Sequence, residues 1–325
     1  METIFISIAS CKEEFLVQTI KSALYNADNP ELLYFGISNM VIDDRDFVSD
    51  PIFNQANINC LEIKYSEALG TGFGRMTASL MHDQKHTYLL QVDAQNIFEK
   101  GWDTIVKKYY KDILKICDKP IISTSPQRWV EGKNREVILF DDSGPTVNPY
   151  DFKTDYTFSS LSIRIHKRGS TENDGTFENF ASVEGAHHDW LDGESFVEHG
   201  LIHASFMFTS FDFIRDVMHD PENPWDGDQI NLSFRSGTRG YRMFTVKDCI
   251  VWSKDKYTRD RELVSSDDWR LVPRGKIGLF NEQRSRETQK QIFSGNYLGY
   301  WGAPTKESID EYYKRIGFDL SKYFN

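Results

Sequence analysis

Residues 70–102 read GTGFGRMTASLMHDQKHTYLLQVDAQNIFEKGW and decide how the chain is expected to fold. A glycine-rich segment with Arg75 leads into a helix predicted over residues 76–81. The apolar run that follows, residues 88–92, predicts a buried strand that ends on Asp93. Packing alone does not explain this carboxylate, because an unpaired charge at the end of a buried strand is costly. Open α/β sheets place ligand-binding groups at the carboxyl ends of their strands, so the segment predicts the floor of a ligand site.

The sequence on both sides of this segment alternates between strand and helix patterns. Short β-branched or apolar runs predict strands, and apolar residues at helical spacing predict helices. Further strands are expected over residues 3–9, 33–39, 58–63 and 121–124, and helices over residues 13–26 and 101–117. Alternation of this kind is typical of α/β domains, so we predict a mostly parallel sheet.

The second half of the chain is less regular. Residues 127–200 are rich in Asp, Asn, Ser, Thr and Gly, which predicts strands and long loops over the site. Beyond them, strands are expected over residues 202–208, 241–246 and 249–252, and helices over residues 211–218 and 226–235. A terminal helix is expected over residues 308–315, with Ser308 as its N-cap.

Composition narrows the class of protein. The hydrophobic content of 39% and aromatic content of 14% support a packed core. The net charge of −11 disfavours nucleic acid as a partner, because phosphate backbones attract the opposite sign. The amino terminus has no signal-peptide pattern, no apolar run is long enough to span a membrane, and the four cysteines form no CxxC pair. We therefore expect a cytoplasmic protein without a membrane partner.

Three pieces of the sequence, in order, resemble one enzyme family. They are IFISIASCKEEFLVQTIKSALYNADNPELLYFGIS from residue 4, YLLQVDAQNIFEKGWD from residue 88, and HASFMFTSFDFIRDVMHDPENPWDGDQINLSFRSGTRGYRMFTV from residue 203. Together they resemble the intracellular N-acetylglucosaminyltransferases that modify hydroxyproline, and the relatives of those enzymes. The resemblance implies a Rossmann-like glycosyltransferase fold of the A type and transfer with retention at the anomeric carbon. It implies a glycosyltransferase domain over residues 1–260 and a C-terminal extension over residues 261–325.

Within that domain, residues 1–125 would form the nucleotide-binding half and residues 126–260 the acceptor-side half. The donor implied is a nucleotide-diphosphate sugar, most of all a UDP-sugar that carries GlcNAc or another hexose. The acceptor implied is a hydroxyl group on a protein, a glycan or another molecule.

The resemblance also assigns roles to residues. Arg75 matches the family arginine and would contact the diphosphate, which suits the planar fork of a guanidinium. Asp93 matches the first carboxylate of the metal motif. Asp228 matches the first acidic residue of a Gly-Glu-Glu piece and would act as the catalytic carboxylate, on the acceptor or on hydroxyls of the donor sugar. Trp102 is expected in the core.

Two positions depart from the family pattern. Gln95 and Ser253 stand where the family has histidines, and imidazole is the better ligand for manganese and similar metals. Two readings stay open. Either a divalent metal (Mn²⁺ or Mg²⁺) is held by Asp93, Gln95, Ser253 and the diphosphate, with Asp255 substituting for a histidine, or metal binding is weak or dispensable.

The sequence leaves other functions open and contains a second group of histidines. The alternatives are a non-catalytic nucleotide-sugar-binding protein, a glycosyltransferase acting on a modified nucleic-acid base, and a nucleotidyltransferase. The adjacent residues His187 and His188, with His199 and His203, suggest a second metal site. However, neighbouring side chains on an extended segment point in opposite directions, which favours a polar loop.

Overall fold

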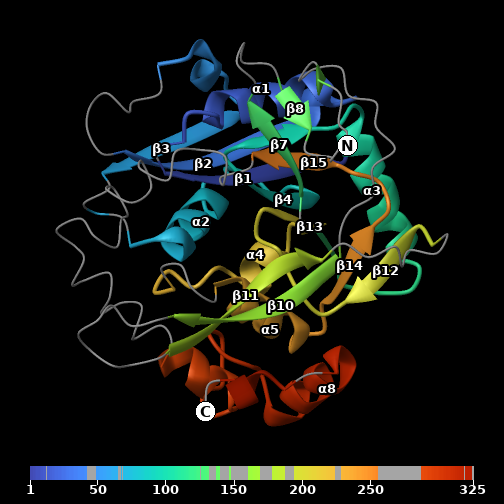
Figure 1. Ribbon diagram of the computed structural model, residues 1–325. Coiled ribbons are helices and arrows are strands. Elements are labelled where there is room, and N and C mark those ends of the chain that lie inside the picture. Colours follow the sequence, from blue (N-terminus) through green and yellow to red (C-terminus); the bar gives the residue numbers. More distant parts are fainter. Residues whose placement is uncertain are drawn as a thin grey trace.

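The expected α/β fold with a mixed, mostly parallel sheet is confirmed in a computed structural model of the chain (Figure 1). The structure describes residues 1–11, 13–41, 49–64, 67, 69–124, 126–131, 137–139, 146–147, 160–168, 178–186, 194–223, 228–254, 287–317 and 319–323. The central sheet has eight strands, in the order β12 (Phe196–His199), β14 (Arg242–Val246), β6 (Pro120–Ser123), β13 (Phe206–Ser210), β4 (Tyr88–Asp93), β1 (Ile4–Cys11), β2 (Leu33–Val41) and β3 (Ile58–Lys64).

The strand order reverses next to the strand that carries Asp93. Strands β1, β2, β3 and β4 run parallel to one another, whereas β13 lies antiparallel between β4 and β6. The chain moves away from β1 through β2 to β3 on one side and returns to β4 on the other. Ala9 pairs with Asp93, the last residue of β4, and β1 continues to Cys11, so the carboxyl ends of both strands lie at the same edge of the sheet. Open α/β sheets bind their ligands where the strand order reverses in this way.

Alternating residues of β1 face two different cores. Ile4, Ile6 and Ile8 belong to the core that contains residues of α1 (Leu16–Asn26) and α3 (Trp102–Ile113). Phe5 belongs to the opposite core, with residues of α4 (Phe213–Asp216) and α5 (Asp228–Gly237). Helix α2 (Thr71–Ser79) covers this second face, and Figure 1 shows α1 and α2 on opposite sides of the sheet.

Helix α2 begins five residues before the predicted start, because the glycine-rich segment is helical. Glycine disfavours helix, which is why the sequence pattern misplaced this boundary. The structure gives a reason for Gly72: a Cβ atom there would lie 2.2 Å from the Asp220 carbonyl oxygen and 2.5 Å from that of Asn223. The Gly72 backbone N–H donates to the Asn223 carbonyl at 3.1 Å. Gly72 thus lets α2 touch the loop that leads toward α5.

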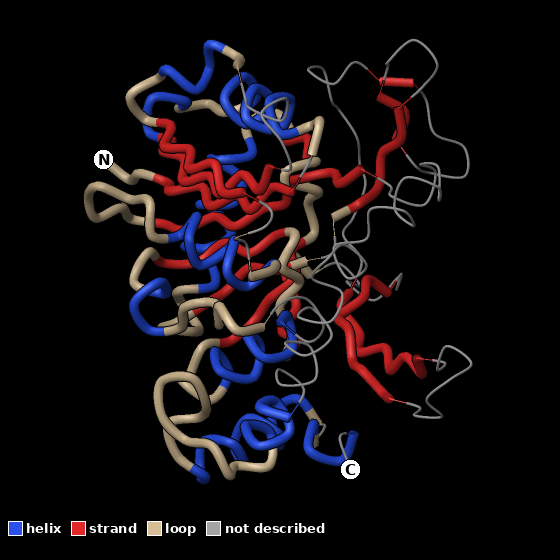
Figure 2. The backbone as a smooth tube through the Cα atoms, turned by 90° about the vertical axis from the view of Figure 1, so that its left-hand side faces the viewer, coloured by secondary structure: helices blue, strands red, loops and turns tan. Residues whose placement is uncertain are grey.

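Segments outside the central sheet form two smaller sheets. One has the order β5 (Asn96–Phe98), β15 (Val251–Lys254), β7 (Gln127–Glu131), β8 (Val137–Leu139) and β9 (Thr146–Val147). The other is an antiparallel hairpin of β10 (Ser160–Arg168) and β11 (Glu178–Ala186). Figure 2 shows the outer strands of both sheets on the side opposite the amino terminus, which is the side where β1 and β4 end.

The C-terminal helix α8 (Lys306–Ile316) packs on α5. Tyr312 lies with its ring 5.7 Å from that of Phe234, and its hydroxyl donates to the Gly200 carbonyl at 2.8 Å. The N-cap is Thr305, whose hydroxyl accepts from the Ser308 backbone N–H. The prediction of Ser308 as N-cap was therefore wrong: Ser308 is the third helical residue and the reciprocal partner in a capping box.

Trp102 and Asp103 anchor the start of α3. Trp102 is fully buried, as predicted, and its indole N–H donates to the Ala23 carbonyl at 2.9 Å. Asp103 is also fully buried and accepts from the Asp28 backbone N–H at 2.7 Å and from the Asn29 amide at 2.9 Å. Both residues of the WD pair therefore join α3 to the end of α1.

His199 is expected to make the protein sensitive to acid. Its Nε2 lies 3.0 Å from the Ser123 carbonyl oxygen, and its Nδ1 accepts from the Leu201 backbone N–H at 3.2 Å, so both ring atoms are used by the neutral form. Burial lowers the pKa of His199 from 6.5 to about 4. As the pH falls, this histidine takes up a proton in the unfolded chain before it does so in the folded protein. Its contribution to the free energy of unfolding is therefore complete above about pH 6.5 and is lost as the pH falls toward 4.

We expect this residue to account for a loss of about 2 kcal/mol in unfolding free energy between about pH 7.5 and about pH 5. Urea unfolding at the two pH values measures the loss. The His199→Asn variant keeps an acceptor near the Leu201 N–H and cannot titrate, so its loss should be smaller by that amount. Equal losses in the variant and the natural protein would contradict the assignment.

Candidate functional site

Arg75 lies at the centre of a buried polar cluster. The residue projects from α2 and is 8% exposed. One terminal nitrogen donates to Asp228 Oδ2 at 2.6 Å, and the other donates to Asp93 Oδ1 at 3.2 Å. The three residues that the sequence singled out as a diphosphate contact, a motif carboxylate and a catalytic carboxylate are therefore brought together. Their chemical roles stay predictions.

Asp93 is held on both sides. Its second carboxylate oxygen, Oδ2, accepts from the Ser205 hydroxyl at 2.5 Å, just before β13 begins. The side chain of Asp93 is 21% exposed, which makes it the most accessible member of the cluster, since Arg75 is 9% and Asp228 4% exposed. Any group that reaches the cluster from solvent therefore meets Asp93 before Asp228.

A buried histidine joins the cluster from the other side. His219 Nδ1 lies 3.7 Å from Asp228 Oδ2, and His219 Nε2 lies 2.5 Å from Gln91 Oε1. Because the Gln91 amide nitrogen donates to the Ala204 carbonyl at 2.8 Å, its oxygen is the acceptor and His219 carries its proton on Nε2. A continuous set of polar contacts thus links β4, α2, α5 and the two loops on either side of β13–α4.

The charges in the cluster follow from burial and pairing. Burial lowers the pKa of Arg75, but the attraction of Asp228 and Asp93 outweighs it and raises that pKa overall. Burial raises the pKa of Asp228, and Arg75 opposes this rise. Burial lowers the pKa of His219 well below its ordinary value, and repulsion from Arg75 adds to the effect. The fixed positive charge of the cluster is therefore the guanidinium.

Gln95 and Ser253 lie on neighbouring backbone segments, and Gln95 is two residues after Asp93. Gln95 follows β4 and is 5% exposed. Ser253 on β15 pairs with Asn96, and the next backbone N–H along β15, that of Lys254, donates to the Gln95 carbonyl at 3.1 Å. The two positions where the family resemblance expects histidines are thus adjacent in space. Asp255, His187 and His188 lie outside the described residues.

Among the described residues, those near Asp93 do not fit the divalent metal that the resemblance implies. Both oxygens of Asp93 already accept hydrogen bonds, one of them from a guanidinium. Positions 95 and 253 supply a neutral amide and a neutral hydroxyl, so Asp93 is the only charged ligand among these three positions. Within the described part of the chain, no three His, Cys, Asp or Glu side chains are grouped as a metal site would need. We therefore assign no metal ligands here.

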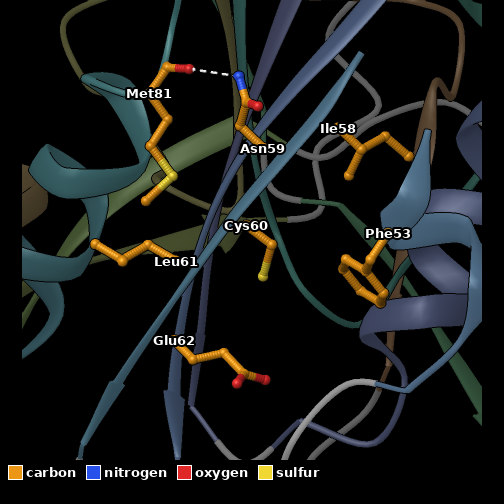
Figure 3. A pocket seen from close by; sticks show the side chains of 7 residues that line it. All are labelled: Phe53, Ile58, Asn59, Cys60, Leu61, Glu62 and Met81. Atoms are coloured by element: carbon orange, nitrogen blue, oxygen red, sulfur yellow. Dashed lines mark hydrogen bonds between the residues drawn. The ribbon is translucent and has the colours of Figure 1, made fainter. Parts of the chain in front are cut away.

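A pocket of about 540 Å³ lies elsewhere, beside strand β3 at the edge of the sheet (Figure 3). Phe53, Ile58 and Met81 contribute to its lining, and the Asn59 amide donates to the Met81 carbonyl at 3.0 Å. Burial raises the pKa of Cys60 to about 12, so this lining thiol stays protonated and is a poor nucleophile. None of the described residues that line this pocket was singled out by the sequence as a site residue.

Sequence reasoning missed three members of the cluster. Gln91 had a signal, because it is the polar residue inside the apolar run YLLQVD and is 2% exposed. A polar side chain in a buried strand needs a partner, and its partner proves to be His219. Ser205 and His219 lie in loops, where nothing in the pattern distinguishes them from other polar residues.

Solved structures with a similar fold were found. The crystal structure of GalNAc-T7 with UDP, GalNAc and Mn²⁺ matches with a TM-score of 0.53 at 11% identity, over 100% of this chain and 56% of that chain. This protein therefore spans only about half the length of that one. The structure of S. aureus TarS 1-349 with UDP-GlcNAc matches with a TM-score of 0.42 at 12% identity, over 90% of this chain and 73% of that chain. The fold is that of the A-type glycosyltransferases.

The sequence comparison then gives the family. Residues 42–322 match the glycosyltransferase (GlcNAc) family, and the chain belongs to it. Among curated proteins, none matches the chain. The chain is accordingly a member of a glycosyltransferase family, as the sequence predicted. The helices of the described residues include none that is long and apolar enough to cross a membrane.

Proposed function

We propose that the protein transfers GlcNAc, or a closely related hexose, from a UDP-sugar to an acceptor hydroxyl with retention of anomeric configuration. The observation that carries the proposal is the position of Arg75 between two carboxylates, beside the ends of β1 and β4. The family description names GlcNAc, and the GalNAc-T7 structure that shares the fold contains UDP and GalNAc. Both support a UDP-sugar donor.

Arg75 would stabilise the charge that develops on the departing diphosphate. Its hydrogen bonds to Asp228 and Asp93 use two of the five N–H groups of a guanidinium, so other N–H groups can donate to phosphate oxygens. The cluster is buried, and in a water-poor site such bonds are stronger than in bulk solvent. Asp93 and Asp228 hold the guanidinium in place before the donor arrives.

Retention corresponds to attack on the face from which the diphosphate leaves. The acceptor oxygen bonds to the anomeric carbon as the bond from that carbon to the phosphate oxygen breaks. The electron pair of the broken bond stays with the phosphate, which then takes the acceptor's proton. The resemblance to hydroxyproline-modifying enzymes supports a protein hydroxyl as the acceptor, and Asp228 is the carboxylate that the resemblance assigns to the acceptor or the donor sugar.

A thermal-shift screen of UDP-, GDP- and CMP-sugars tests the donor. At a ligand concentration about 100-fold above Kd, binding should stabilise the folded state by about 2.7 kcal/mol, and UDP-sugars should give the largest rise in Tm. NMR of the transferred sugar's anomeric proton then reports retention or inversion. The donor assignment fails if no UDP-sugar raises Tm more than the GDP- and CMP-sugars do.

A further inference from the structure

Both carboxylate oxygens of Asp93, which would bind a divalent metal, already accept hydrogen bonds from the protein. Arg75 donates to one oxygen of that carboxylate at 3.2 Å, and Ser205 donates to the other at 2.5 Å. A dication placed on the same carboxylate would have to lie next to the guanidinium. Like charges repel strongly at such distances inside a protein, so the metal and Arg75 compete for Asp93.

A second cation lies along the strand that carries Ser253. Lys254 is 8% exposed, and its ammonium group lies 3.4 Å from the centre of the Phe15 ring and 5.0 Å from that of Trp129. Trp129 donates its indole N–H to the Gln95 carbonyl at 3.1 Å, which ties this aromatic site to position 95. Lys254 thus holds an ammonium group on the residue that follows Ser253, and an ammonium group repels a dication brought near it.

A guanidinium can neutralise the leaving diphosphate in place of a metal ion. In metal-dependent transfer the ion neutralises the departing diphosphate. An arginine pairs with phosphate oxygens through two parallel N–H···O bonds and keeps its charge at any pH the protein meets. Arg75 is fixed in advance by Asp228 at 2.6 Å and by Asp93, so it needs little reorganisation when charge develops.

We propose that this glycosyltransferase works without a divalent metal and that Arg75 is the cation that receives the leaving diphosphate; this inference rests on the proposed UDP-sugar function. The carbon–oxygen bond to UDP breaks, its electron pair stays on the phosphate oxygen that Arg75 contacts, and the acceptor oxygen forms the new bond. The acceptor's proton passes to the phosphate. No oxidant, reductant or further co-reactant is needed.

The direct test compares donor binding and turnover with and without metal. UDP-GlcNAc should raise Tm by the same amount in EDTA and in Mn²⁺, and the rate of UDP release should differ by less than about twofold between the two buffers. Mn²⁺ titrated into the protein with UDP-GlcNAc present, followed by electron paramagnetic resonance, should show no more bound ion than UDP-GlcNAc alone binds. A Tm rise or turnover that appears only with Mn²⁺ overturns the inference and leaves the UDP-sugar function standing. No Tm rise with any nucleotide sugar in either buffer overturns both.

A gain-of-function pair sharpens the test. The Gln95→His/Ser253→His variant places imidazoles at the two positions where the family resemblance expects them and should bind Mn²⁺ in the resonance titration. The matched Gln95→Leu/Ser253→Ala variant changes the same positions without adding ligands and should bind none. The proposal would be contradicted if the natural protein or the matched variant bound as much Mn²⁺ as the histidine variant. In that case the amide of Gln95 and the hydroxyl of Ser253 would not limit metal binding.

Discussion

Replacing Arg75 with methionine is expected to destabilise the protein by about 3–5 kcal/mol and to abolish glycosyl transfer. Arg75 pairs with Asp228 at 2.6 Å and with Asp93 at 3.2 Å, and the Asp228 side chain is only 4% exposed. Removing the guanidinium leaves a buried carboxylate without its cation, which costs more than losing an exposed pair. Urea unfolding gives the stability change, and release of UDP from a UDP-sugar gives the activity.

Two companion variants make the Arg75 result interpretable. The side chain of Arg215 is 73% exposed and pairs with Asp216. Arg215→Met should change the free energy of unfolding by less than about 0.5 kcal/mol. Arg75→Met combined with Asp228→Leu also removes the stranded carboxylate and should recover part of the lost stability without recovering transfer. If Arg75→Met is as stable as Arg215→Met, the buried pairing described here is wrong.

The Asp93→Asn substitution is expected to lower kcat by about 100-fold or more while leaving the fold intact. Asparagine keeps the size of the side chain and an oxygen for the Ser205 hydroxyl, but it loses the charge that holds Arg75 at the site. Because Asp93 is 21% exposed, the stability loss should stay near 1 kcal/mol. Steady-state rates of UDP release and the circular-dichroism melting curve measure the two effects.

Asp50 offers a matched control for Asp93. It has a similar exposure of 25%, and it also pairs with a cation, Lys21, at 2.6 Å. Asp50→Asn removes the same charge far along the sequence from the cluster and should leave kcat within about twofold of the natural value. Full transfer activity in Asp93→Asn, or an equal loss in Asp50→Asn, would remove Asp93 from the reaction.

The central sheet was predictable because its strands and helices have clear periodic patterns. Ile4, Ile6 and Ile8 face one core and Phe5 the other, which is what a strand buried on both faces requires. The start of α2 was not predictable in the same way. Gly72 is helical there because of a contact with Asp220 and Asn223, some 150 residues later, and helix propensity contains no information about such a contact.

The candidate site also contains residues that the sequence could predict and residues that it could not. Arg75, Asp93 and Asp228 stand out by residue type and by the family resemblance, and the structure brings them together. Ser205 and His219 gain their place in the cluster only through folding, since a serine or histidine in a loop is ordinary. The divalent metal stays a prediction, because Gln95 and Ser253 supply only a neutral amide and a neutral hydroxyl beside the carboxylate of Asp93.

The contact between Arg75 and Asp228 also determines when the site can exist during synthesis. The two residues are 153 positions apart in the sequence. At roughly 5–20 residues per second, the ribosome adds Asp228 about 8–30 s after Arg75. Strand β13, which completes the sheet on the far side of β4, arrives in the same interval. For that period the nascent chain carries Arg75 and Asp93 without Asp228, so the polar cluster cannot be complete until the second half of the chain is made.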